Sequence, residues 1–261
     1  MWNCTALGVI KATQNRMDAK AGARPVRFAP RRAGRTAREA ETEDVNRLLE
    51  ADAIKPTSSE WGFTIVLVPR KDGTLRFCVD YWLLKVVNKK DSYPLPRMDE
   101  RINSVSEATI SSTLACNSGC RQVAIAPEGR EKTAFVCHAG ASKYKQMPFG
   151  LKNGPTKFHG ALDIIFFGIK WQSCLIYRYD VIVYSKTGKE HICHVGRVLR
   201  MLRDARMTFR LFKCRFLRMT VENLGHVIKP GRLGVMDALT RSLREAHFPA
   251  TRTQVRSFEG M

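Results

Sequence analysis

A β-hairpin between residues 63 and 81 constrains the fold of this chain more than any other segment. Residues 63–68 form a run of β-branched and apolar side chains, and residues 75–81 form a second one. The segment between them contains Asp72-Gly73, a pair that favours a tight hairpin turn. Because the connection is short, the two strands must lie antiparallel. The sequence therefore predicts an antiparallel sheet in the first third of the protein.

Strands and helices are interleaved along the rest of the chain without a βαβ repeat. Helical periodicity begins at Thr36 and ends before Pro56, and it returns in residues 155–169 and 188–206. A short helix is expected near residues 98–105. Further strands are expected at residues 109–114, 120–126, 133–137, 143–147, 175–177, 181–184, 207–211 and 224–228. This pattern predicts an α+β protein built on an antiparallel sheet.

Basic side chains outnumber acidic ones by a wide margin. The chain has 44 Lys and Arg against 24 Asp and Glu, which gives a formal net charge of +20. A surface of this charge attracts polyanions, because each phosphate contact releases condensed counterions. Nucleic acid is therefore the expected partner, and a ribosomal or histone-like protein or unselected charge drift is the alternative. Residues 1–35 are basic without periodicity and predict a loosely ordered arm.

Membrane and disulfide signals are weak in this sequence. No apolar run approaches the roughly 20 residues that span a bilayer, so no membrane partner is expected. The N-terminus lacks a basic flank before an apolar core, which favours an intracellular protein, cytoplasmic or nuclear, over a secreted one. The eight cysteines form no Cys-x-x-Cys pair, which favours buried free thiols. Cys193 and His194 point in different directions on a helix, so a zinc site with His191 is not expected.

Five ordered sequence blocks resemble the reverse transcriptase of gypsy-type LTR retrotransposons. The blocks are residues 71–81 (KDGTLRFCVDY), 89–99 (KKDSYPLPRMD), 130–135 (REKTAF), 147–155 (MPFGLKNGP) and 224–228 (LGHVI). The resemblance runs from about residue 15 to the C-terminus. It implies an RNA-directed DNA polymerase with a right-hand fold, in which the palm is an antiparallel sheet backed by helices and a fingers subdomain lies beside it.

The resemblance also implies a division of the chain and a set of partners. The arm at 1–35 precedes a reverse transcriptase domain at 36–261, with fingers at about 36–108 and 127–154, palm at about 109–126 and 155–230, and the start of a thumb or connection at 231–261. The implied partners are an RNA or DNA primer–template and a dNTP, and the implied cofactor is Mg²⁺. The oligomeric state stays open.

Of the three metal-binding Asp residues that the resemblance implies, this sequence retains one. The first is expected at the end of the word Ser-Thr-Leu-Asp, where Ala115 stands. The other two form the end of the word Tyr-x-Asp-Asp, where Tyr179 replaces the first and Asp180 remains as the metal ligand. Mg²⁺ requires hard oxygen ligands, so we expect impaired binding. Loss of one member of a concerted catalytic set can cost on the order of 10⁴ in rate, which predicts an inactive polymerase.

Other site positions are carried over from the same resemblance. The residues expected to contact the nucleotide are Arg70, Lys71, Arg76, Cys120, Phe149 and Gly150. Cys120 stands where the family has an aromatic residue that screens the sugar 2′ position. Lys213 is expected as the proton donor to pyrophosphate. Without the resemblance, each lone Lys or Arg would be read as a solvated surface residue.

Three functions remain open from the sequence. The first is a reverse transcriptase domain by descent that no longer catalyses. The second is a non-enzymatic protein that keeps a basic nucleic-acid-binding cleft, and the third is a polymerase with substituted ligands. Scattered point decay favours the first, because Asp to Ala and Asp to Tyr are each reachable by one base change.

Overall fold

The computed structural model describes residues 8–10, 13–69, 73, 75–91, 93, 108–177, 180–219, 221–223, 226–229 and 232–235. The helices of this part are α1 Arg35–Glu50, α2 Trp82–Val87, α4 Gly154–Ile165 and α5 Gly188–Asp204, with 3₁₀ helices η1 Gly119–Gln122, η2 Pro127–Thr133 and η3 Leu211–Lys213. No helix in the described ranges is long and apolar enough to cross a membrane. The short helix predicted near residues 98–105 lies outside the described residues.

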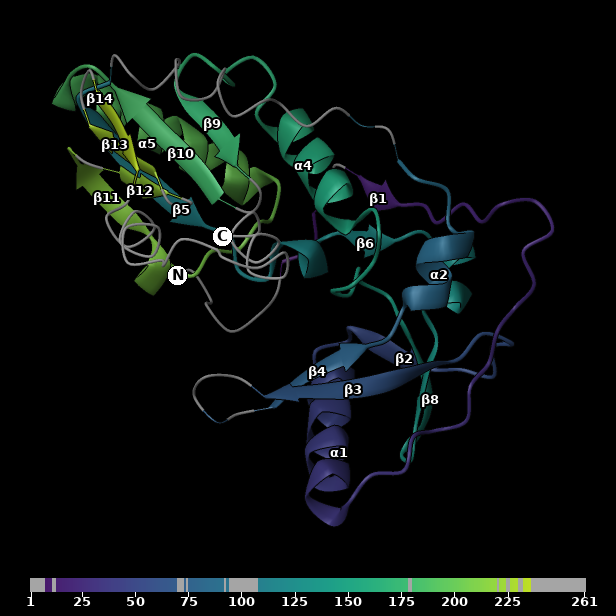
Figure 1. Cartoon of the computed structure of the whole chain (residues 1–261). Coiled ribbons are helices and arrows are strands. Elements are labelled where there is room, and N and C mark those ends of the chain that lie inside the picture. The colour runs from purple at the N-terminus through teal and green to yellow at the C-terminus, as the bar shows by residue number, and fades with distance from the viewer. Residues whose placement is uncertain are drawn as a thin grey trace, which may run out of the picture.

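A five-stranded sheet forms the lower part of the molecule in Figure 1, with α1 beside it. Its strands are β2 Ile54–Pro56, β3 Phe63–Pro69, β4 Leu75–Val79, β7 Phe135–Cys137 and β8 Gly140–Tyr144, in the order β2-β8-β7-β3-β4. Strands β3 and β4 pair antiparallel, with Ile65 opposite Val79 and Pro69 opposite Leu75. This pairing confirms the predicted hairpin.

A four-stranded antiparallel sheet forms the upper part, and α5 lies behind it (Figure 1). Its strands are β5 Ile110–Ala115, β9 Cys174–Tyr177, β10 Asp180–Ser185 and β11 Arg215–Arg218, in the order β11-β5-β10-β9. Two smaller sheets consist of β1 Gln14–Asn15 with β6 Ala124–Ile125, and of β12 Val221–Asn223, β13 His226–Lys229 and β14 Arg232–Val235. The α+β fold on a largely antiparallel framework is as predicted.

Two predicted strands are wrong, and tertiary contacts explain both. Residues 120–126 form the end of η1 and the two-residue β6, and the chain turns into η1 at Ser118, which has φ 50°. Gly119 then packs so closely against the Phe158 ring of α4 that a β-carbon there would lie 2.7 Å from the ring. Residues 207–211 contribute only a single bridge, between Phe209 and Cys116, before η3 begins.

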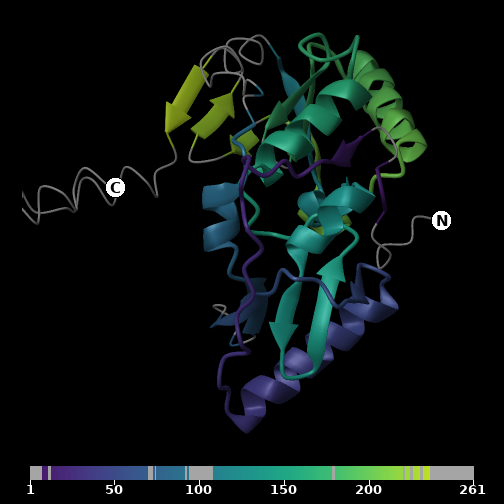
Figure 2. The same ribbon diagram turned by 90° about the vertical axis from the view of Figure 1, so that its right-hand side faces the viewer.

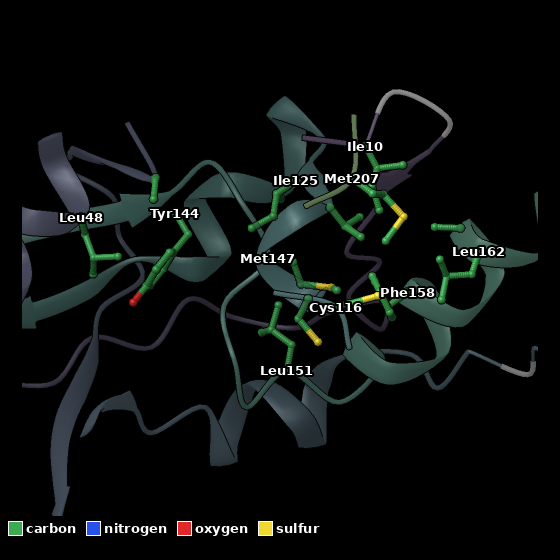
Figure 3. Packing of buried hydrophobic residues seen from close by; sticks show 14 of the residues in the cluster. Ile10, Leu48, Cys116, Ile125, Tyr144, Met147, Leu151, Phe158, Leu162 and Met207 are labelled. Carbon is green, nitrogen blue, oxygen red and sulfur yellow. The ribbon is translucent and has the colours of Figure 1, made fainter. Parts of the chain in front are cut away.

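The N-terminal arm is packed where the structure describes it. Strand β1 pairs parallel with β6, and the side chains of Ile10 and Met17 are only 2% and 3% exposed. Lys132 donates a hydrogen bond of 2.5 Å to the Met17 carbonyl oxygen. Figure 3 shows Ile10 beside Ile125 and Met207. The prediction of a loosely ordered arm is therefore wrong for residues 8–10 and 13–17, because isolated apolar side chains within the basic segment enter the core.

One continuous core joins the two large sheets. Leu48 of α1 and Tyr144 of β8 lie at one end of it, Met147 lies in the middle, and Phe158 and Leu162 of α4 lie at the other (Figure 3). Figure 2 shows the same stacking of the parts from the side. Cys116, Cys137 and Cys174 are free thiols that are buried in this core. The position of one sheet relative to the other therefore depends on the packing of shared side chains.

Shortening Ile10 tests the packing of the arm. We expect Ile10→Ala to destabilise the protein by about 2–5 kcal/mol, because the side chain is fully enclosed and its removal leaves a cavity. The neighbouring Val9 is 38% exposed and provides a matched control on the same segment. Val9→Ala should change the urea midpoint little. Equal midpoints for the two variants in urea unfolding followed by circular dichroism would contradict the packing described.

Candidate functional site

The register of β5 against β10 brings two of the predicted site positions together. Ala115, the last residue of β5, lies directly opposite Asp180, the first residue of β10. Opposite residues in an antiparallel pair have β-carbons about 5 Å apart. Carboxylates at both positions could therefore share a cation. In this chain Asp180 provides one carboxylate, and Ala115 opposite it provides only a methyl group.

The Asp180 carboxyl group is half-buried and lies near one ammonium group and two thiols. Burial raises the pKa of Asp180 above its usual range, and the positive charge of Lys213 in η3 opposes that shift. Burial also raises the pKa of the Cys116 thiol, and the nearby Asp180 and Cys214 add to the effect. Cys214 has a pKa raised by burial and partly lowered by a backbone hydrogen bond from Ala115. The groups that interact with Asp180 are thus an ammonium and two thiols.

This set of side chains does not fit a pair of magnesium ions. Mg²⁺ takes hard oxygen ligands in octahedral geometry, whereas thiols suit softer metals. Across the described ranges, no three His, Cys, Asp or Glu side chains are grouped so as to hold a metal. Asp180 is the one predicted metal ligand, and Tyr179, the position of a lost Asp, lies outside the described residues.

A polar network that the sequence did not predict fixes the end of β5. The backbone N–H of Arg210 donates to the Ala115 carbonyl oxygen at 2.9 Å, and its Nε donates to Asn117 Oδ1 at 2.8 Å. The Gln122 amide nitrogen donates to the carbonyl oxygens of Asn117 and Thr208. The only signal in the sequence was the presence of polar residues inside otherwise apolar runs. These bonds hold Ala115 and the following turn in place.

A second network lies beneath the sheet, on the side of α5. His191 is buried, with Nε2 at 2.7 Å from Ser112 Oγ and Nδ1 at 3.1 Å from Ser185 Oγ. Ser112 Oγ also accepts the backbone N–H of Leu217 at 3.1 Å. Burial, followed by the proximity of His194, lowers the pKa of His191. The network ties β5, β10 and β11 to α5, while Cys193 points outward and is exposed.

Two of the predicted nucleotide contacts, Arg76 and Gly150, lie near opposite ends of β4. Arg76 is exposed on that strand, and Gly150 has φ +92° with its β-carbon position 3.6 Å from the Val79 carbonyl oxygen. The Arg121 guanidinium lies 5.5 Å from the centre of the Phe149 ring, a cation–π contact that sequence reasoning missed.

The remaining predicted nucleotide contacts are buried or outside the described part. Cys120 is 2% exposed, and its Sγ lies 3.7 Å from the β-carbon position of Gly154, so it forms no open surface. Arg70 and Lys71 lie outside the described residues. Contact of any of these positions with a nucleotide stays a prediction.

The fold and motifs match a known family over most of the chain. The family model described as "Reverse transcriptase (RNA-dependent DNA polymerase)" matches residues 68–228. The chain belongs to the reverse transcriptase family. The match includes the β3–β4 hairpin turn, Ala115 and Asp180, and so contains the whole region described above.

Transposon polyproteins are among the curated relatives of this reverse transcriptase domain. It is 28% identical over 229 residues to the retrovirus-related Pol polyprotein from transposon 297 of Drosophila melanogaster, covering 85% of this chain and 22% of that protein. It is 28% identical over 237 residues to the transposon Tf2-3 polyprotein of Schizosaccharomyces pombe, covering 90% of this chain and 18% of that protein. The predicted kinship with LTR retrotransposons is confirmed, and the chain spans about a fifth of those polyproteins.

Solved reverse transcriptases share the fold of this domain. The foamy viral protease-reverse transcriptase in complex with double-stranded DNA superposes with a TM-score of 0.85 at 19% identity, covering 99% of this chain and 46% of that one. The same viral protein in complex with an RNA/DNA hybrid gives a TM-score of 0.82, also at 19% identity, and covers 99% and 35%. These likenesses confirm the predicted polymerase fold.

Replacing Asp180 tests the electrostatic description of the site. Since the folded-state pKa is raised above the unfolded value, the folded state binds more protons, and stability falls as the pH rises between the two values. Asp180→Asn removes this penalty. We therefore expect it to raise the urea midpoint at about pH 8, with a smaller gain at about pH 4, near the unfolded pKa of Asp. The exposed Asp204 gives a control, Asp204→Asn, for which no such pH-dependent gain is expected. A gain at pH 8 no larger than at pH 4 would contradict the raised pKa.

Proposed function

We propose that this chain is the polymerase module of a retrotransposon polyprotein that still binds primer–template but no longer catalyses RNA-directed DNA synthesis at a useful rate. The observation that supports the proposal most directly is the pairing of Ala115 with Asp180. The family relies on clustered carboxylates. In this chain, the side chain opposite the surviving acid Asp180 is the methyl group of Ala115.

The chemistry of the remaining side chains supports loss of catalysis. A single half-buried carboxylate whose pKa is raised binds cations less readily than an ionised cluster. Lys213 places a positive charge beside that carboxylate, which further disfavours a second cation there. The thiols of Cys116 and Cys214 offer Mg²⁺ no hard ligand. We infer that the remaining side chains neither hold two Mg²⁺ ions in position nor neutralise their charge.

Retention of binding is supported by charge and by the fold. The net charge of +20 favours contact with a phosphate backbone. The Arg121–Phe149 pair offers a cation over an aromatic face, groups that suit phosphate and base contacts. The related foamy viral proteins were solved with double-stranded DNA and with an RNA/DNA hybrid. A dNTP is the further ligand that we propose for this surface.

The assignment of subdomains follows the two large sheets. All strands of the five-stranded sheet fall within the ranges 36–108 and 127–154, which we propose as the fingers. All strands of the four-stranded sheet fall within 109–126 and 155–230, which we propose as the palm. Most of 231–261, proposed as the start of a thumb or connection, lies outside the described residues.

Restoring the lost acids tests the proposal. In primer extension with Mg²⁺ on an RNA template, we expect no product from the unaltered chain. The double variant Ala115→Asp with Tyr179→Asp should gain on the order of 10³-fold or more over that background, because both missing carboxylates return and the register still places position 115 opposite Asp180.

Two controls make the result interpretable. Adding Asp180→Asn to the double variant should abolish the gain, since the restored activity must depend on the surviving carboxylate. Mn²⁺ should be supplied in parallel. Robust extension by the unaltered chain would overturn the proposal of inactivity. Inactivity of the double variant with tight, salt-sensitive binding to primer–template would instead favour the alternative, a non-enzymatic nucleic-acid-binding protein derived from such a domain.

A further inference from the structure

Helix α5 has a strongly basic outer face. Its inner face carries His191, Val198 and Leu202, which are buried against the four-stranded sheet. The opposite face is exposed to solvent (Figure 1, Figure 2). The exposed cations of this face are Lys189, Arg197, Arg200 and Arg203. We call these four residues the α5 basic face.

The spacing of these four residues places them on one side of the helix. At about 100° per residue, their directions fall within an arc of about 120°. The distance from Lys189 to Arg203 along the helix axis is about 21 Å at 1.5 Å per residue. The face is therefore a straight, rigid row of positive charge on a helix that is anchored by its capping box at Thr187 and Glu190.

The charges of the α5 basic face are mostly unmatched. Arg203 lies 3.4 Å from Asp204, but Lys189, Arg197 and Arg200 form no ion pair with a carboxylate of the described residues. The Arg200 Nε donates instead to the Gly196 carbonyl oxygen of its own helix. Arginines spaced three apart on a helix repel one another. An anionic partner would relieve that repulsion.

Helix α1 provides a comparison within the same chain. Arg35 pairs with Glu39, and Arg47 pairs with Asp44, so cations there are balanced by neighbouring acids. That pattern is typical of a solvated helix surface. On the α5 basic face, Arg203 is the one member with such a carboxylate partner among the described residues.

We propose that the α5 basic face is a docking surface for the phosphate backbone of a nucleic-acid duplex, distinct from the site around Asp180. A duplex carries one negative charge per about 1.7 Å of axis, so about 12 phosphate charges lie within the length of this face. Arginine guanidinium groups bind phosphate oxygens in a two-pronged geometry. An acidic peptide lacks this fixed density of charge, which is why a duplex is the better fit.

Charge removal on α5 tests the proposal without requiring any polymerase activity. The triple variant R197Q/R200Q/R203Q keeps the helix propensity close to that of arginine. Binding of a fluorescein-labelled DNA duplex of about 20 base pairs is measured by anisotropy at several KCl concentrations. We expect the slope of log K against log [KCl] to become shallower by about 2 to 3, since each lost phosphate contact accounts for about 0.9.

A matched variant removes the same charge elsewhere. R35Q/R38Q/R47Q on α1 lowers the net charge equally and should leave the slope nearly unchanged. If circular dichroism shows that the triple α5 variant is not folded, the single variant R197Q should still make the slope shallower by about 0.9. No change in slope for the α5 variants, or an equal change for both helices, overturns the proposal. The proposal is also overturned if the α5 variant no longer binds poly-glutamate but still binds the duplex. The partner of the α5 basic face would then be an acidic protein.

Discussion

The antiparallel pairing of β5 with β10 is the interaction on which the rest of the site depends. Alternate residues of a strand point to opposite faces, so a slip of one position would separate Ala115 from Asp180 altogether. Two sets of hydrogen bonds oppose such a slip. The Arg210 and Gln122 network holds the end of β5, and the His191 network ties both strands to α5 from below. The pairing of β5 with β10 is thus maintained by side chains that are not among the predicted catalytic residues.

This separation would allow the loss of catalysis that we propose without loss of the fold. Clustered carboxylates repel one another and resist burial, so active sites are often destabilising. Replacing an acid at position 115 by alanine removes such a cost and leaves the strand pairing intact. Asp180 begins the inner strand β10, where burial raises its pKa. The loss of catalysis that we propose would therefore cost the fold little.

Local signals in the sequence predicted most of the described architecture. The β3–β4 hairpin, α4 and α5 each have a turn, a proline or an apolar period that identifies them. Residues 120–126 and the arm could not be predicted, because contacts with distant side chains decide their conformation. The close approach of Gly119 to Phe158 and the burial of Ile10 have no local signature. In the site, motif position identified Ala115 and Asp180, whereas the thiols of Cys116 and Cys214 became neighbours of Asp180 only through the fold.

The continuous core between Leu48 and Leu162 has a consequence for how the molecule loses structure. Side chains from both large sheets belong to one cluster, so each sheet buries part of its apolar surface against the other. Opening one sheet exposes apolar surface of the other, which makes the two a single cooperative unit. A destabilising substitution in α1 or β8 then shortens the lifetime of the whole protein in the cell, because both sheets lose their shared packing together.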